Sequence, residues 1–323
     1  DVYEKINSQS TTLGDLVGDE NIYNGIQTSA NDIYIHTPIE DDGDFFYFQK
    51  DSKEWKIEKT LTRPYFKTSG GIDNLNTYRP LKPNSFVIYP YLKTAEGDIK
   101  FVEIDQLKND FPMAYAYLSA YQSRLQSPTR DIKPEPLTEN EWYRYGRHQS
   151  LDKCDVPAKI IVGVLSQGDK YAIDCSGTLI SSGGTAGYCM ITLPAELPYS
   201  IYYIQALLNS KYLEWYSALI GEVFRGGYIA RGTKVLKKLP IRIIDFTNKK
   251  DKGLHDKISS IQERLIKIQA SIDQNLGHDR ALIPLQRDFD AMKSEMSSAL
   301  KELYGLGEMD SQIPLISELY ETN

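Results

Sequence analysis

The sequence predicts an α+β fold: a mixed β-sheet region with flanking helices, followed by an antiparallel coiled-coil helical hairpin. Short runs of β-branched and aromatic residues, separated by turn residues, occupy residues 33–91 and 159–193. Apolar residues at a spacing of three to four lie between and after these runs, which indicates helices. From Leu254 onward the apolar spacing becomes that of a coiled coil.

The first 130 residues contain four predicted strands and one predicted helix. Between Phe111 and Leu125 apolar residues recur every three to four positions. This helix is expected to end at Ser127-Pro128, because the residue before a proline disfavours helical backbone. The predicted strands are 33–35, 45–48, 55–57 and 86–91.

After a proline-bearing linker, a second group of strands is predicted, with Gly183-Gly184 in a turn between them. Ser200 can cap a following helix, and Gly221 comes shortly after the end of that helix. The strands are 159–165, 171–174 and 188–193. The inward stripe of the helix is expected to be Ile201, Ile204, Leu208, Trp215 and Leu219.

Two apolar seams with alternating spacings of four and three predict the hairpin, Leu254 to Ile272 and Leu285 to Leu303. Gly277 lies between them, and Pro284 suits a first helical turn. Each arm would reach roughly 30 to 35 Å, which suits a spacer or docking strut, although the edge of an ordinary helical bundle remains the alternative. The expected parts are residues 1–247, a helical hairpin over 248–306 and a tail over 307–323.

The net charge of −7 argues at first against a nucleic-acid partner, because phosphates attract lysine and arginine. The charges are unevenly distributed, however, with acidic residues clustered between positions 40 and 44. One face is therefore expected to be basic although the whole chain is acidic. Six basic residues follow one another with no acid between them: Arg225, Arg231, Lys234, Lys237, Lys238 and Arg242.

The composition, 41% hydrophobic and 25% charged, is typical of globular domains. No apolar run approaches the ~20 residues needed to cross a bilayer, so a membrane protein is not expected. The three cysteines are far apart and form no CxxC pair, which favours a reducing cytoplasm over a disulfide framework. The chain begins at Asp1 without a signal segment, and we expect it to be an excised piece of a longer cytoplasmic protein.

No catalytic residue and no metal site are predicted. The sequence contains no Walker-type glycine loop, no HExxH and no GxSxG, so the usual signatures of phosphate, zinc and serine chemistry are missing. The histidines lack metal-ligand spacing to one another and to cysteine. They are His36, His148, His255 and His278.

Five segments carry a family resemblance, and they occur in the family's order. WYRYGRHQSLDK (142–153) resembles a W-Y-x-Y-G-R-x-Q-x-L motif, and LGDLVGDENIYNGIQTSANDIYI (13–35) is similar to an opening element. KIIVGVLSQGDKYAID (159–174), YYIQALLNSKYLEWYSALIGEVFRGGYIARGTKVLKKLPI (202–241) and KELYGL (301–306) resemble later elements. On these residues the chain resembles the C-terminal target-recognition, or specificity, domain of type IIG-like restriction-modification enzymes and adenine-specific DNA methyltransferases.

This resemblance implies a sequence-specific reader of double-stranded DNA without a catalytic centre of its own. An adenine methyltransferase needs a glycine-rich loop for S-adenosylmethionine and a (Asp/Asn)-Pro-Pro-(Tyr/Phe) loop for the flipped adenine. The sequence contains neither, so we expect no cofactor in this fragment and S-adenosylmethionine in the catalytic domain of the parent protein. The expected partners are double-stranded DNA, that methyltransferase domain and, through the helical hairpin, a second copy of the chain.

The candidate DNA contacts lie in three of the resembling segments. Arginine forks and side-chain amides can read base edges, and lysines and glycine-exposed amides can hold phosphate. If residues 142–150 are extended, alternate side chains point into the fold and the others form a polar side. The structural alternatives are that Arg147 and Gln149 pair with nearby carboxylates and brace the core, and that the polar residues between Gln27 and Asn31 are ordinary turn residues. The candidates are Gln27, Thr28, Asn31, Arg144, Arg147, Gln149, Arg225, Tyr228, Arg231 and Lys234.

Two other classes of function fit the composition. The chain has 23 tyrosines and an acidic balance, which suit a protein that binds carbohydrate with aromatic faces. The long heptads argue against that interpretation. A free-standing enzyme with an unrecognised active site is the third class, and turnover by the isolated chain would favour it.

Overall fold

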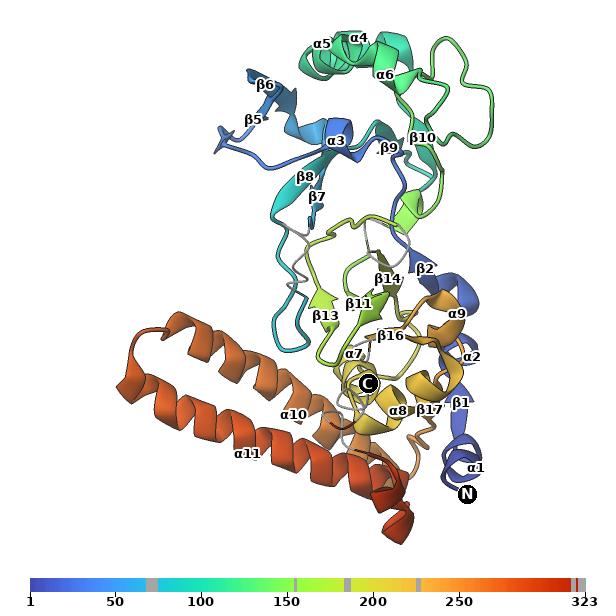
Figure 1. Ribbon diagram of the computed structural model, residues 1–323, viewed down its shortest axis with the longest axis vertical. Coiled ribbons are helices and arrows are strands. Elements are labelled where there is room, and N and C mark those ends of the chain that lie inside the picture. Colours follow the sequence, from blue (N-terminus) through green and yellow to red (C-terminus); the bar gives the residue numbers. More distant parts are fainter. Residues whose placement is uncertain (68–74, 154–155, 183–186, 225–227, 315–317, 319–323) are drawn as a thin grey trace.

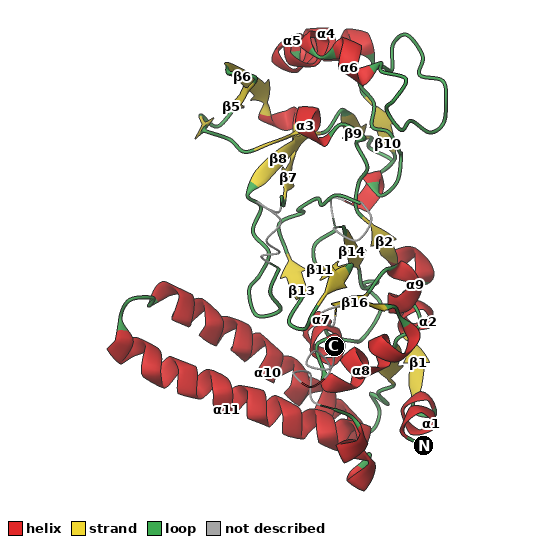
Figure 2. Cartoon of the chain, in the orientation of Figure 1, coloured by secondary structure: helices red, strands yellow, loops and turns green. Residues whose placement is uncertain are grey.

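The computed structural model describes residues 1–67, 75–153, 156–182, 187–224, 228–314 and 318. The protein is elongated, and its N-terminus lies in the lower half of the view in Figure 1. Short strands and helices form the upper part, and two long helices project sideways from the lower part (Figure 2). The predicted α+β class with a C-terminal helical hairpin is confirmed.

The helices and strands of the upper part come from residues 31–65 and 85–125. Its strands are β3 (Ile35–His36), β4 (Glu40–Asp41), β5 (Phe45–Lys50), β6 (Lys53–Glu58), β7 (Thr62–Tyr65), β8 (Ser85–Ile88), β9 (Tyr91–Lys93) and β10 (Ile99–Phe101). Its helices are α3 (Asn31–Tyr34), α4 (Ile104–Asp110), α5 (Pro112–Ala120) and α6 (Gln122–Leu125), and Lys59–Leu61 forms a 3-10 turn. The strand expected over 33–35 is wrong for Ile33 and Tyr34, because both belong to α3.

A buried carboxylate fixes the start of α5 on the neighbouring hairpin. The two oxygens of Glu58, at the end of β6, accept the backbone N–H groups of Met113 (2.8 Å) and Ala114 (2.9 Å). These N–H groups have no partner within the helix, and a negative charge at this end is favourable. The helix predicted between 111 and 125 is confirmed, with a break at Tyr121 that separates α5 from α6.

The lower part combines both ends of the sequence. Its strands are β1 (Ser10–Thr12), β2 (Ile22–Asn24), β11 (Lys159–Gly163), β12 (Leu165–Ser166), β13 (Tyr171–Asp174), β14 (Tyr188–Ile191), β15 (Val223–Phe224), β16 (Tyr228–Ala230) and β17 (Pro240–Arg242). Its helices are α1 (Val2–Asn7), α2 (Leu13–Val17), α7 (Ile201–Leu208), α8 (Lys211–Ile220), α9 (Thr233–Leu236), α10 (Lys249–Gln274) and α11 (Asp279–Tyr304). Asp19–Asn21, Leu151–Lys153 and Gly307–Gln312 form 3-10 turns.

The strands pair in several small antiparallel sheets. The largest among the described residues has the order β13-β11-β14-β2, so the early strand β2 lies at its edge. The other pairings are β3-β8-β7, β4-β5-β6, β12-β16-β15, β9-β10 and β1-β17. Two isolated parallel bridges, Ile26–Ser181 and Tyr65–Leu179, place the segment 179–181 beside both the end of β7 and the residues that follow β2. The strands predicted over 45–48, 55–57, 171–174 and most of 159–165 and 188–193 are confirmed.

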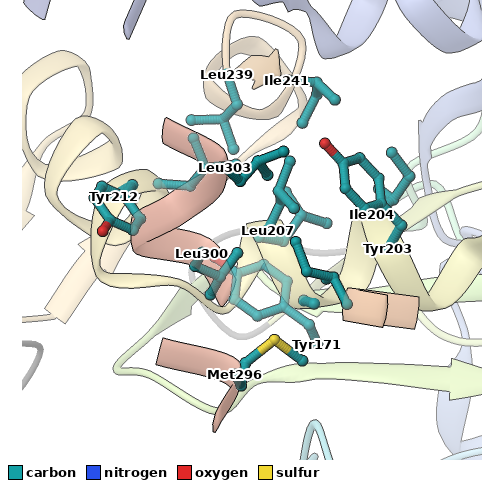
Figure 3. Close-up of a cluster of buried hydrophobic side chains, with 14 of the residues drawn as sticks. Tyr171, Tyr203, Ile204, Leu207, Tyr212, Leu239, Ile241, Met296, Leu300 and Leu303 are labelled. Atoms are coloured by element: carbon teal, nitrogen blue, oxygen red, sulfur yellow. The ribbon is translucent and has the colours of Figure 1, made fainter. Parts of the chain in front are cut away.

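Two large hydrophobic cores hold the structure together. The upper core is aromatic and contains the Trp142, Tyr143 and Tyr145 side chains of the WYRYGR segment. The lower core surrounds α7, with side chains from β13, β17 and α11 packed around it (Figure 3). Met296, Leu300 and the other inward residues of the hairpin belong to this lower core. Hydrophobic contacts therefore cross the boundary expected after residue 247.

The helical hairpin is confirmed, and each arm contains 26 residues. At 1.5 Å per residue each arm is about 39 Å long. Asn248 caps α10 by accepting N–H groups from the first turn, and Gly305 in the left-handed conformation ends α11. Pro284 was expected in a first turn, but it lies inside α11 because that helix begins earlier, at Asp279.

The single helix expected between Ser200 and Gly221 is wrong, because α7 and α8 are separate helices. Ser200 caps α7 as predicted. The Ser210 hydroxyl donates to the Leu207 carbonyl (2.6 Å) and accepts the Leu213 N–H (3.3 Å), which ends one helix and starts the next. The new direction leaves Leu219, an expected inward residue, 53% exposed.

Candidate nucleic-acid interface

Two segments more than a hundred residues apart in sequence lie side by side and run antiparallel. The Gly146 N–H donates to the Thr28 carbonyl (3.0 Å), and the Arg147 N–H donates to the Gln27 carbonyl (3.1 Å). The Gln149 amide extends this pairing by donating to the Gly25 carbonyl (2.6 Å). We call residues 24–31 and 146–150 the paired strip. It brings together the candidates Gln27, Thr28, Asn31, Arg147 and Gln149.

Two glycines make the close approach within the paired strip possible. A Cβ atom on Gly146 would lie 1.9 Å from the Ser29 hydroxyl and 2.4 Å from the Asp131 carbonyl. A Cβ atom on Gly25 would lie 2.2 Å from the Ile180 carbonyl. Only glycine lets these backbones approach so closely. The glycine of the YGR motif therefore positions the arginine that follows it.

Arg147 is held by a carboxylate that sequence reasoning missed. Its Nη2 atom lies 2.7 Å from both oxygens of Asp131. The Gln27 amide nitrogen donates to the same carboxylate (3.1 Å). Asp131 is fixed in turn, because the Ser29 hydroxyl donates to its carbonyl (2.7 Å). Asp131 lies in an irregular, proline-bearing linker, and no periodicity in the sequence marks it.

Two buried arginines join the paired strip to the upper core. Arg144 was expected on the polar side of an extended segment, but its side chain is buried and donates to the carbonyls of Lys133, Pro134 and Tyr145. Arg130, which the sequence did not single out, donates to the carbonyls of Thr28 (2.8 Å) and Arg144 (2.5 Å). Both guanidinium groups satisfy backbone acceptors, and they brace the strip from the inside.

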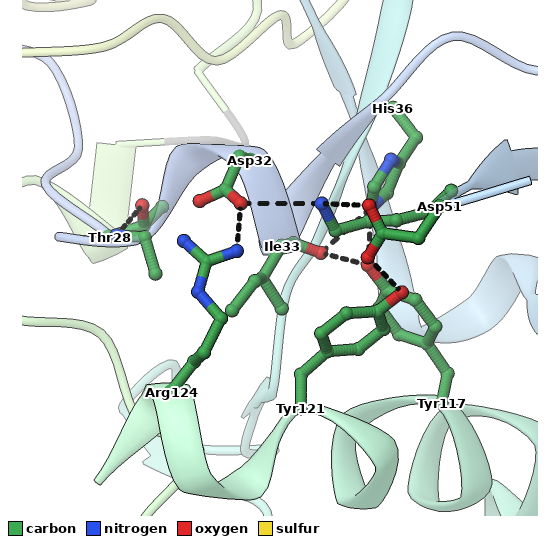
Figure 4. A network of polar contacts seen from close by, with 10 residues as sticks. Thr28, Asp32, Ile33, His36, Asp51, Tyr117, Tyr121 and Arg124 are labelled. Atoms are coloured by element: carbon green, nitrogen blue, oxygen red, sulfur yellow. Dashed lines mark hydrogen bonds and ion pairs between the residues drawn. The ribbon is translucent and has the colours of Figure 1, made fainter. Parts of the chain in front are cut away.

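Thr28 and Asn31 combine turn chemistry with an exposed amide. Thr28 is buried, its hydroxyl donates to the Asn31 side chain (2.6 Å), and it accepts the Ala30 N–H (3.0 Å). Asn31 is exposed. The helix α3 that follows is tied to α6 by the ion pair between Asp32 and Arg124, at 2.5 Å (Figure 4). This ion pair holds the start of α3, and with it the end of the paired strip, against α6.

Burial shapes the ionisation of His36 in the same network. The Nε2 atom of this side chain lies 2.8 Å from the Ile33 carbonyl and 2.8 Å from the Tyr117 hydroxyl. Its ring stacks on Phe48, with centroids 4.1 Å apart. Burial is the main cause that lowers the pKa of His36 to about 4. His36 is therefore a neutral core residue near neutral pH.

The second group of candidates lies around β15, β16 and α9. Lys234 is exposed at the start of α9. Tyr228 is 44% exposed and is paired across the hairpin with Phe224, which is 40% exposed. Arg225 lies outside the described residues. The described part of this region therefore offers an exposed cation on α9 and an exposed aromatic pair on β15 and β16.

Arg231 has a different environment from the one expected of a DNA contact. Its side chain is fully buried and pairs with the equally buried Glu214 of α8. It also donates to the carbonyl and hydroxyl of Ser166, and Glu214 accepts the Tyr171 hydroxyl (2.7 Å). The sequence alone could not show this, because Glu214 is 17 residues away on another element. Arg231 anchors the base of the β15-β16 hairpin.

A pocket of about 570 Å³ connects the two groups of candidates. The helix α9 packs beside β2, where the paired strip begins (Figure 1). Asn24 and Ser182 line the pocket on the side of the strip, and Thr233, Lys234 and Lys238 line it on the side of α9. The Ser150 hydroxyl donates to the Asn24 carbonyl, which makes the strip continuous with the pocket wall. Sequence reasoning had not chosen Asn24, Ser182 or Lys238 as site residues.

The described part of the chain contains no cluster of three or more histidine, cysteine, aspartate or glutamate side chains able to hold a metal ion. No described helix is long and apolar enough to cross a membrane. Cys189 is a buried free thiol, and burial raises its pKa to about 12. Cys175 is also free, and it is exposed.

A known family matches the part of the chain that contains most of the candidate residues. Residues 92–241 match the TaqI-like C-terminal specificity domain. Over these residues, just under half of the chain, the protein resembles a specificity domain of the TaqI type. The resemblance inferred from the sequence is confirmed, and the matched residues of the specificity domain include Arg147, Gln149, Tyr228 and Lys234. The other strand of the paired strip, residues 24–31, precedes the matched range.

A curated relative matches almost the whole chain. The type II restriction enzyme and methyltransferase RM.Eco57I of Escherichia coli is 48% identical over 322 residues, which is 99% of this chain and 32% of the relative. The chain thus spans about a third of the length of that relative. The specificity domain, the paired strip and the helical hairpin all fall within the aligned length, and neither comparison points to a carbohydrate-binding protein.

Proposed function

We propose that this chain is the sequence-recognition module for double-stranded DNA in a larger restriction-modification enzyme that also methylates adenine. The observation that carries the proposal is the convergence of three distant segments on one surface. The paired strip supplies base-reading side chains, and the α9 side of the pocket supplies two lysines. This surface belongs to a chain whose residues 92–241 match a TaqI-like specificity domain.

The two sides of the surface divide the work of recognition. Gln149 and Arg147 carry amide and guanidinium groups that can reach base edges in the major groove. Lys234 and Lys238 are compact charges that suit phosphates and carry no sequence information. Because Arg144 and Arg231 are buried among protein acceptors, their part in the proposal is to position the two sides.

The acidic total charge is compatible with this function because the acidic stretch at residues 40–44 lies elsewhere, and two lysines, Lys234 and Lys238, outnumber the one acidic residue that lines the pocket, Glu222. The acidic stretch expected from the sequence is on β4 and the turn before β5, in the upper part of Figure 1. There the Asp41 carboxylate binds Lys59 (2.7 Å). The exposed lysines of α9 are beside the pocket instead. The local potential at the pocket, rather than the net charge of −7, governs attraction of DNA.

The rest of the parent protein supplies the chemistry under this proposal. The methyltransferase domain binds S-adenosylmethionine, and the helical hairpin docks this module onto that domain. The alternative partner of the hairpin is a second copy of the chain. The free cysteines suit a reducing compartment, and we place the enzyme in the cytoplasm.

Removal of the two pocket lysines tests the proposal. The change Lys234→Ala with Lys238→Ala should weaken binding to every duplex, and it should reduce the slope of log K against log salt by about 2. The matched control is Lys249→Ala with Lys250→Ala, which removes the same charge from exposed positions at the start of α10. Equal affinity and equal salt slope in both double variants would contradict the proposed surface.

A further inference from the structure

We propose that Asp131, Arg147 and Gln27 form a single reading unit for a G·C base pair, in which the Asp131 carboxylate orients the other two side chains. This inference rests on the proposed function and adds to it the identity of one recognised base. Asp131 is a positioning residue here, and it touches no base itself. Arg147 reads the guanine.

The geometry of Arg147 leaves part of its guanidinium available. Its Nη2 atom contacts both oxygens of Asp131 at 2.7 Å. A guanidinium carries five N–H donors in a planar fork. Asp131 is bound through Nη2 alone, so the second N–H of Nη2 and an N–H of Nη1 can still form two parallel donors along one edge. Within the described ranges, neither Nε nor Nη1 of Arg147 makes a hydrogen bond or ion pair to the protein. The side chain is 34% exposed, which leaves it accessible to a ligand.

The carboxylate beside Arg147 favours a base over a phosphate. Asp131 neutralises the charge of Arg147, and its own side chain is 51% exposed. A phosphate approaching the pair would therefore meet a negative charge at close range. A base edge is neutral, so it can accept hydrogen bonds from the guanidinium without that repulsion. Lysines with no such neighbouring carboxylate are better suited to phosphate.

The donor pattern selects guanine among the four bases. Guanine presents two acceptors, O6 and N7, in the major groove, and an arginine fork offers only donors. Adenine would place its N6 amino group against these donors. The amide of Gln27 is oriented because its nitrogen donates to Asp131 (3.1 Å). Its oxygen makes no hydrogen bond to the part of the chain that the structure describes, and it can accept from the N4 amino group of the paired cytosine.

The backbone holds this unit in one arrangement before any DNA is bound. The Arg147 N–H donates to the Gln27 carbonyl (3.1 Å), and the Ser29 hydroxyl donates to the Asp131 carbonyl (2.7 Å). Gly146 allows the two segments to come this close. Side chains that are already oriented lose less conformational freedom on binding, which strengthens discrimination between bases.

The test selects bound duplexes from a random double-stranded DNA library with the full chain and sequences them. The duplexes that wild-type protein selects should share at least one invariant G·C pair. Arg147→Lys should reduce the preference for that guanine by about 10- to 100-fold, because a lysine cannot make the forked contact. Asp131→Asn should reduce the same preference several-fold while binding to unselected duplexes stays equal or becomes tighter, because a negative charge is lost.

The matched controls are Arg79→Lys and Asp273→Asn. These residues also form a partly exposed arginine–aspartate pair, here through Nε and Nη2 at 2.6 and 2.7 Å, with 50% and 31% exposure, between the body and the helical hairpin. Both controls should keep the wild-type preferences. A second measurement uses only wild-type protein, so it does not depend on the folding of a variant. Replacing the selected guanine by 7-deazaguanine removes the N7 acceptor, and this change should weaken binding.

The outcomes separate the inference from the proposed function. No binding of any duplex by wild-type protein would remove the proposed function. Binding in which Arg147→Lys weakens all duplexes equally would make Arg147 a phosphate contact and overturn the inference alone. A selected base other than guanine at the Arg147-dependent position, or full tolerance of 7-deazaguanine, would overturn it as well.

Discussion

The guanidinium of Arg231 and the carboxylate of Glu214 are buried against each other, and both side chains are fully inaccessible to solvent. This pair fastens β16 to α8 at the foot of the hairpin that carries Phe224 and Tyr228. Removal of one partner leaves an uncompensated charge in the interior. The position of the β15-β16 hairpin therefore depends on Arg231 and Glu214, two side chains that solvent does not reach.

Glu214→Gln should lower the free energy of unfolding by about 3 kcal/mol, because Arg231 would remain charged and buried. Urea denaturation followed by circular dichroism measures the change. Glu295→Gln is the control, because Glu295 pairs with Lys257 on the surface of the hairpin, where both side chains are more than 40% exposed. A loss below about 1 kcal/mol for Glu214→Gln would mean that the pair does not stabilise the fold.

Gly146→Ala should destabilise the protein by about 1 to 3 kcal/mol and weaken selection of the preferred DNA site, because the new Cβ atom would overlap Ser29 and the Asp131 carbonyl. Gly253→Ala in α10 is the matched change, because nothing lies within 4 Å of its Cβ position. That control should stabilise the protein by about 0.5 to 1 kcal/mol. Thermal unfolding measures the stability of the two variants, and selection of duplexes measures their DNA preference. Equal stability and equal preference would argue against the close approach of Gly146 to Ser29 and Asp131.

His36 should make stability depend on pH in the acidic range. Burial lowers the pKa of the folded His36 side chain to about 4, whereas the unfolded side chain has a pKa of about 6.5. The unfolded chain therefore takes up the proton first. The contribution of neutral His36 to the free energy of unfolding is fully present above pH 6.5, and it falls by up to about 3 kcal/mol as the pH decreases to 4.

The change His36→Gln should flatten that part of the pH dependence, measured as unfolding free energy between pH 4 and 7. His278→Gln serves as its control because His278 is exposed in the turn of the helical hairpin. An unchanged pH profile in His36→Gln would show that other groups cause the acid sensitivity.

The exposed aromatic pair on the β15-β16 hairpin should contribute to DNA affinity. Phe224→Ala with Tyr228→Ala is expected to weaken duplex binding on the order of tenfold, equivalent to about 1.4 kcal/mol, with little change in stability. Tyr3→Ala is the control, because Tyr3 is 43% exposed on α1 and stacks on Tyr216. Fluorescence anisotropy with a labelled duplex measures the difference. Equal affinities for the three proteins would remove the hairpin from the interface.

Periodic features were predictable from the sequence, whereas contacts between distant segments were not. The coiled-coil spacing predicted α10 and α11, because the seam of a helical hairpin repeats along the chain itself. The motif around Trp142 identified the arginine-bearing segment. By contrast, nothing in the sequence pairs Arg231 with Glu214 or Arg147 with Asp131, because side-chain partners depend on how the elements fold together.

Local hydrogen bonds explain why the structure differs from the predicted single helix and from the predicted exposure of Arg144. The break between α7 and α8 follows from the hydroxyl of Ser210, which competes for backbone groups, while the apolar spacing around it suggested one helix. Arg144 was assigned to a polar side by alternation, but its long side chain turns inward to reach the carbonyls of the 133–134 loop. Arginine can be buried wherever backbone acceptors surround it, so its position in a pattern does not settle its exposure.

If this chain by itself recognises a specific sequence in duplex DNA, it should bind that sequence far more tightly than other duplexes. The most direct test is equilibrium competition between the duplex selected from a random library and a scrambled duplex of the same base composition, at about 150 mM salt. We predict that the chain binds the selected duplex at least about 1,000-fold more tightly than the scrambled one. Equal affinity for the two duplexes, or no binding of either, would show that the chain does not read DNA sequence by itself.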